Sequence, residues 1–136
     1  MVRTFAGVIV VDSSVWIASF RGLERPSVLR LRQLLLTQRL IVGDLILLEV
    51  LQGARNDQHA SRLDTQLRRY EVVSMLDDSL VGATARNFRR LRSVGITPRK
   101  TIDLIIGTYC IEHRHALLQD DRDFLPMAEH LGLRLI

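Results

Sequence analysis

GVIVVDSSVWI, residues 7–17, places a continuous apolar run directly before an acid and two serines. The β-branched run from Gly7 to Val11 has no polar alternation, which indicates a strand buried on both faces, as in a parallel sheet. Ligand sites of parallel α/β folds lie beyond the carboxyl ends of the strands. The stretch therefore predicts a central strand and, in Asp12, a candidate site residue. The simpler interpretation is that Asp12 only caps the next helix, as either Ser13 or Ser14 could do.

Strands and helices alternate outward from this stretch. Apolar positions at helical spacing and turn residues predict helices over 26–38, 44–53, 57–69, 78–94, 101–114 and 126–131, and strands over 7–11, 40–42, 71–75, 115–118 and 133–136. This alternation predicts an α/β fold, a three-layer α/β/α sandwich with a central parallel sheet of four to five strands. No linker or internal repeat interrupts the 136 residues, so we expect a single domain over 1–136.

Composition excludes several classes of protein. No apolar run approaches the roughly 18 residues of a membrane span, and the run ending at Asp12 is too short for a signal peptide. We therefore expect a cytoplasmic protein without a membrane partner. The single cysteine, Cys110, cannot form an intramolecular disulfide, and the four histidines show no metal-ligand spacing. Cys110 is expected in the core.

The net charge is +4, and Lys100 is the only lysine beside 18 arginines. Arginine binds phosphate through two parallel hydrogen bonds and stacks on bases. A basic surface permits a polyanionic partner without proving one. The alternative is a solvated helix face in an arginine-rich protein. The candidate RNA-binding residues are Arg86, Arg89, Arg90, Arg99 and Lys100.

Acids occur at further strand–helix junctions. Glu49 stands in the apolar helix LILLEVLQG, either on a solvent stripe with Gln52 and Asn56 or aimed at a site. Asp103, in RKTIDLIIG, begins a helix whose dipole alone would favour an acid there. The loop LLQDDRDF follows an expected strand and carries three acids that repel one another unless they are solvated, capped or bridged by a cation: Asp120, Asp121 and Asp123.

Converging carboxylates without a histidine or cysteine partner favour a hard, oxygen-binding ion, Mg²⁺ or Mn²⁺. Such an ion can activate water and stabilise displacement at a phosphodiester. An acidic metal pocket in a basic protein is what a nuclease requires.

The four motifs VVDSSVWI, LLEVLQG, TIDLIIG and DDRDF resemble, in order and flanking pattern, those of PIN-domain ribonucleases of the VapC toxin type. The resemblance extends from residue 8 to the C-terminus, and DSSVWI and DRDF are its most specific parts. It implies four catalytic acids, Asp12, Glu49, Asp103 and Asp121, of which Asp12, Asp103 and Asp121 bind the metal. Gln119 departs from the threonine found in many relatives at this position.

The resemblance further implies an endoribonuclease that cleaves structured RNA, typically a tRNA, and so inhibits translation. It implies a homodimer, inhibition by a cognate VapB-type antitoxin, and contact with promoter DNA only through that antitoxin. A PIN nuclease of RNA processing outside a toxin–antitoxin pair, or a non-catalytic PIN binding module, remains an alternative. A receiver domain would need paired acids after the first strand and a lysine after the last, and a HAD-type phosphatase would need a DxD pair; the sequence has neither.

Secondary roles are less constrained. Ser13 supports the site or caps the following helix. Asp123, three residues before Pro126, is expected to cap the last helix, which leaves Asp121 as the better metal ligand. Trp16 and Phe124 either stack on bases or, more simply, pack in the core.

Overall fold

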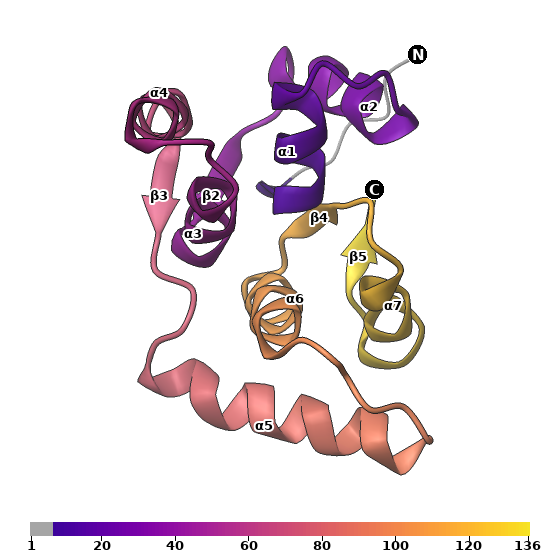
Figure 1. The fold of residues 1–136 in the computed structure, drawn as a ribbon. Coiled ribbons are helices and arrows are strands. Elements are labelled where there is room, and N and C mark those ends of the chain that lie inside the picture. Colours follow the sequence, from indigo (N-terminus) through magenta and orange to yellow (C-terminus); the bar gives the residue numbers. More distant parts are fainter. Residues whose placement is uncertain (1–6) are drawn as a thin grey trace.

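The computed structural model describes residues 7–136, and a five-stranded parallel sheet runs through its centre (Figure 1). The strand order is β3-β2-β1-β4-β5, and every neighbouring pair is parallel. The strands are β1 (Ile9–Val11), β2 (Leu40–Gly43), β3 (Glu71–Val73), β4 (Ala116–Leu118) and β5 (Arg134–Leu135). The predicted parallel α/β fold with four to five strands is confirmed.

Seven α-helices flank the sheet in the described part of the chain: α1 (Ser13–Phe20), α2 (Pro26–Leu35), α3 (Asp44–Gln52), α4 (Asp57–Leu67), α5 (Asp78–Ser93), α6 (Thr101–His113) and α7 (Leu125–Leu131). A short 3₁₀-helix, η1 (Arg122–Phe124), precedes α7. The helix predictions are confirmed apart from shifts at their ends. Within residues 7–136, no helix is both long enough and apolar enough to cross a bilayer.

The strand order reverses direction between β1 and β4. From β1 the chain winds outward through β2 to β3, and it then returns to the other side of β1 to form β4 and β5. Because parallel crossovers are right-handed, this reversal places α1–α4 and α5–α7 on opposite faces of the sheet. The packing agrees, since α1 contacts α2 and α3, whereas α5 contacts α6 and α7. The carboxyl ends of β1 and β4 thus mark the topological switch point, where sites of open α/β sheets form.

The middle strands are buried throughout. All residues of β1 and β4 are at most 2% exposed, as expected for strands covered on both faces. The Asp12 backbone N–H donates to the Leu118 carbonyl at 2.9 Å, so the two strands remain joined at the switch point. The core contains Cys110, as expected, and also Trp16 and Phe124. Because they are buried, Trp16 and Phe124 cannot stack on bases in this conformation.

Gly43, the last residue of β2, lies directly against the side chain of Met75. A Cβ at this position would collide with the sulfur and both neighbouring carbons of Met75, which is fully buried. Gly82, in α5, has open space around its Cα. The two glycines therefore differ in packing and make a matched pair.

We predict that Gly43→Ala lowers the free energy of unfolding by about 1–3 kcal/mol, since overpacking must displace Met75. Gly82→Ala should instead raise it by about 0.5–1 kcal/mol, because alanine favours a helix interior. Urea denaturation of the three proteins measures both. Equal effects of the two substitutions would show that the contact at Gly43 does not limit packing.

Candidate metal centre

Asp12 lies between β1 and α1 and is 3% exposed. Its Oδ2 accepts from the backbone N–H of Ser14 at 3.1 Å and from the Ser14 hydroxyl at 2.6 Å. Its Oδ1 is buried and accepts no hydrogen bond from the described residues. Both interpretations of Asp12 therefore hold in part: one oxygen caps α1, and the other remains available to a ligand.

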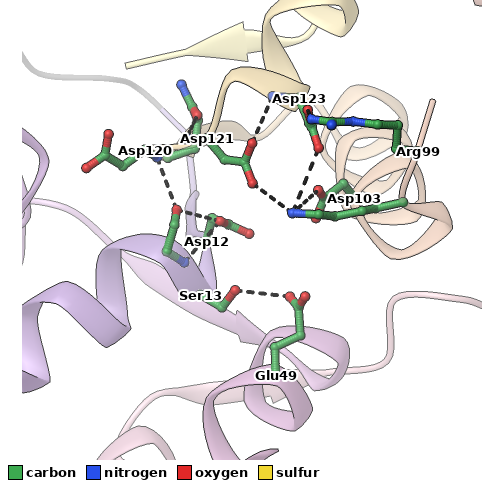
Figure 2. A network of polar contacts seen from close by, with 11 residues as sticks. Asp12, Ser13, Glu49, Arg99, Asp103, Asp120, Asp121 and Asp123 are labelled. Atoms are coloured by element: carbon green, nitrogen blue, oxygen red, sulfur yellow. Dashed lines mark hydrogen bonds and ion pairs between the residues drawn. The ribbon is translucent and has the colours of Figure 1, made fainter. Parts of the chain in front are cut away.

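Glu49 extends from α3 towards the same point (Figure 2). The Ser13 hydroxyl donates to its Oε1 at 3.1 Å, and the side chain is half-buried, whereas Gln52 and Asn56 are exposed. The solvent-stripe interpretation of Glu49 is therefore wrong. Ser13 acts through this contact, since the capping acceptor of α1 is the side chain of Asp12.

Asp103, in the first turn of α6, completes a trio of acids in which Asp12 and Asp103 are buried and Glu49 is half-buried. Asp103 is 4% exposed, and one carboxylate oxygen from each of the three acids lies within 4.8 Å of the others. Burial raises the pKa of all three, and the charge of Asp12 adds to the effect on the other two. The pKa of Asp103 rises to about 7. The trio therefore resists ionisation until a cation offsets its charge.

A second group shares Asp103 and adds Asp123 of η1 and Asp121, the residue that precedes η1. Ligand atoms of Asp103, Asp121 and Asp123 also lie within 4.8 Å of one another, and their side chains face one another in Figure 2. Lys100 donates to Asp121 at 3.2 Å, and Arg99 to Asp123 at 3.0 Å. The acids predicted from the sequence thus form two groups with one shared member.

The capping prediction for Asp123 is wrong. Asp121 caps η1, with its Oδ1 accepting from the backbone N–H of Asp123 at 2.9 Å, and α7 has no side-chain cap at all. The chain makes a 3₁₀ turn before α7, so the cap lies two residues earlier than Pro126 suggests. Gln119 supports this loop, because its Oε1 accepts from the backbone N–H of Asp121 at 2.6 Å.

Asp121 and Asp120 differ in environment. Burial opposes ionisation of Asp121, but the Asp123 N–H and the Lys100 ammonium outweigh it and lower the pKa of Asp121. Asp120 is turned away from the acid groups and contacts Ser27 at 3.2 Å and Arg25 at 3.5 Å. The capping error removes the capping argument for preferring Asp121 over Asp123, since both reach the second group, and leaves only the resemblance of the DDRDF motif in favour of Asp121.

The donor set fits a hard divalent ion. Every ligand atom of the two groups is a carboxylate oxygen, which Mg²⁺ and Mn²⁺ favour. Buried oxygens without a hydrogen-bond donor among residues 7–136 occur on Asp12, Asp103 and Asp123. A buried polar atom without a partner is costly, and a cation between these oxygens would remove that cost.

The candidate RNA-binding residues divide into two sets. Arg99 and Lys100 contact the acids directly, whereas Arg86, Arg89 and Arg90 lie exposed along α5 and form no ion pair with the site acids within residues 7–136.

Ser14 contacts the site in a way that the sequence does not predict. Its hydroxyl also accepts from the Asp120 N–H at 3.1 Å, which links the loops after β1 and β4.

Comparison with known proteins gives one sequence family. The family described as "PIN domain" matches residues 9–129. The chain is 27% identical to VapC ribonuclease Mb1587 of Mycobacterium bovis and to ribonuclease VapC11 of Mycobacterium tuberculosis, over 93% of this chain and 96% of each relative.

The fold is similar to that of a solved structure, VapBC2 of Rickettsia felis bound to a DNA fragment from its promoter. The TM-score is 0.77 at 16% identity, with 96% of this chain and 98% of the other covered. The resemblance drawn from the four sequence motifs is therefore confirmed.

The raised pKa of Asp103 predicts a pH-dependent stability. Between its ordinary value and about 7 the folded, metal-free protein retains a proton that the unfolded chain releases, so stability falls as pH rises through this window. The Asp103→Asn variant has no carboxyl group at this position and therefore does not titrate there. The free energy of unfolding of Asp103→Asn should therefore exceed that of the parent by a margin that grows from about pH 4 to about pH 8, by on the order of 1–4 kcal/mol.

Denaturation of EDTA-treated protein across this range measures the difference. An advantage that stays constant with pH would contradict the assignment of the raised pKa to Asp103.

Proposed function

We propose that this chain, which belongs to the PIN-domain family, is a metal-dependent endoribonuclease and the toxin of a toxin–antitoxin pair. The observation that carries the proposal is the trio of Asp12, Glu49 and Asp103 at the switch point of the sheet, with buried oxygens on Asp12 and Asp103 that have no hydrogen-bond donor among residues 7–136. The sequence relatives named VapC ribonuclease supply the reaction class.

The trio would hold a divalent ion, Mg²⁺ or Mn²⁺. A bound ion supplies an activated water and neutralises charge at the phosphodiester. Ser14 fixes the orientation of Asp12 through two hydrogen bonds, and Ser13 fixes Glu49 through one. These contacts preorganise the carboxylates, so little rearrangement is needed when the ion binds. Asp121 and Asp123 extend the site towards the exposed side.

The RNA backbone would meet cations at the edge of this site. Arg99 and Lys100 border the acids, and the exposed arginines of α5, Arg86, Arg89 and Arg90, offer further phosphate contacts. A structured RNA, with tRNA as our specific candidate, is the proposed substrate, and inhibition of translation is the proposed consequence.

We also propose a cognate VapB-type antitoxin as partner, a homodimer as the assembled form, and contact with promoter DNA only through the antitoxin. The solved VapBC2 assembly, one chain of which has the fold of this chain, was bound to a promoter DNA fragment and so supports an antitoxin partner and a link to promoter DNA. The second candidate is an RNA-processing PIN nuclease outside such a pair. It is favoured by the same site and differs only in its biological setting.

Cleavage should require both the ion and the trio. Asp12→Asn, Glu49→Gln and Asp103→Asn should each slow RNA cleavage by at least about 100-fold, because loss of even an outer-shell partner costs 10–100-fold in metal sites. EDTA should abolish cleavage by the parent, and added Mg²⁺ or Mn²⁺ should restore it. Gel assays on a tRNA pool measure these rates.

Asp57→Asn is the matched control, since Asp57 is an exposed acid in the first turn of α4. This variant should cleave at the parental rate. Parental cleavage by Asp103→Asn, or cleavage in EDTA, would contradict the proposed site. Absence of any cleavage by the folded parent with both metals would favour a binding module.

Expression alone should test the toxin role. Induction in a bacterium without the partner should arrest growth and reduce incorporation of labelled amino acid into protein, and Asp12→Asn should remove both effects. Co-expression of the cognate antitoxin should restore growth. Harmless expression of a protein that is active in vitro would assign the chain to RNA processing instead.

A further inference from the structure

The two acid groups differ in the cations beside them. Within residues 7–136, Asp12 and Glu49 form no ion pair, whereas the group of Asp103, Asp121 and Asp123 surrounds the Lys100 ammonium. The Nζ atom lies 3.2 Å from Asp121, 3.8 Å from Asp123 and 3.9 Å from Asp103. A positive charge therefore already stands among three carboxylates that are spaced closely enough to share an ion.

The position of Lys100 follows from its place in the chain. It is the residue before α6 and precedes Asp103 by three positions, so both side chains lie on the same side of the helix start. Its ammonium is a compact point charge, unlike the broad guanidinium of the 18 arginines. A single ammonium can contact three acids as a small cation does.

Arg99 offers an internal comparison. It carries the same charge next to the same group, but it pairs with Asp123 alone and its side chain is 81% exposed. Lys100 is the cation that reaches all three acids. Three buried carboxylate oxygens lack a hydrogen-bond donor within residues 7–136. Two of them, Oδ2 of Asp103 and Oδ2 of Asp123, face the ammonium at 3.9 and 3.8 Å, whereas Oδ1 of Asp12 has no cation of the described residues within 4 Å.

We infer that the Lys100 ammonium takes the second cation position of the site, so that the protein binds one divalent ion, at Asp12, Glu49 and Asp103. The inference rests on the proposed metal-dependent function and adds the number of ions and the role of Lys100 as a positioning residue. Before the ion binds, the ammonium offsets the charge of Asp121 at 3.2 Å and adds to the pairing of Asp123 with Arg99. It also disfavours a second divalent ion at the same acids by charge repulsion.

Metal titration tests this inference without any cleavage assay. EDTA-stripped parent and Lys100→Met are titrated with Mn²⁺ by calorimetry and by electron paramagnetic resonance. The parent should bind one Mn²⁺ with the spectrum of an isolated ion. Lys100→Met should bind a second Mn²⁺, and the shared Asp103 should hold the pair at roughly the 3.5–4 Å of two-metal sites, which gives a spin-coupled spectrum.

Arg99→Met is the matched control, because it removes one positive charge from the same group but leaves the ammonium in place. It should still bind one Mn²⁺. Two ions in the parent, one ion in Lys100→Met, or a second ion in Arg99→Met as readily as in Lys100→Met would each overturn the inference. Lys100→Gln serves as a second variant if Lys100→Met fails to fold by circular dichroism.

Failure of the wider proposal gives a different result. If neither the parent nor Lys100→Met binds Mn²⁺, the proposed metal site itself is wrong, and the inference falls with it. If the parent binds two ions and cleaves RNA, the proposed function stands and only the role of Lys100 is refuted.

Discussion

Repulsion among five carboxylates beside the carboxyl ends of β1 and β4 is the constraint on which the rest of the site depends. Asp12 and Asp103 are almost fully buried, and burial raises the pKa of each. The protein offsets part of this cost with the start of α1, the two serines and the Lys100 ammonium. It tolerates the rest because the sheet and its helices fix the acids in place. A functional site often retains such local conflict.

Much of the fold could be predicted from local pattern. The apolar run before Asp12 has no polar alternation, so it could belong only to a covered strand, and β1 is buried as expected. Helix starts at Asp44 and Asp78 and the helix end before Gly95 follow from capping preferences. Strand ends were less accessible to prediction, because β3 stops at Val73 and leaves Met75 to fill the space beside Gly43. Tertiary packing decides that boundary.

The residues of the site were likewise only partly predictable from local sequence pattern. Asp12, Glu49 and Asp103 were found because each acid interrupts an apolar segment at a junction or on a helix. The role of Asp123 could not be read from the position of Pro126, since a 3₁₀ turn intervenes and Asp121 supplies the cap. The location of Lys100 depends on how α6 meets η1, a contact between segments about 20 residues apart that no local pattern encodes.

The acids come from four separate segments, and Asp121 belongs to a loop that follows β4. The complete set of acids therefore comes together only after β4 has paired with β1, which joins residues 107 positions apart. Domains generally fold as units, so a growing polypeptide that still lacks α6 and β4 has no assembled group of acids. The proposed nuclease centre therefore cannot form on the ribosome before α6, which carries Asp103, has been synthesised.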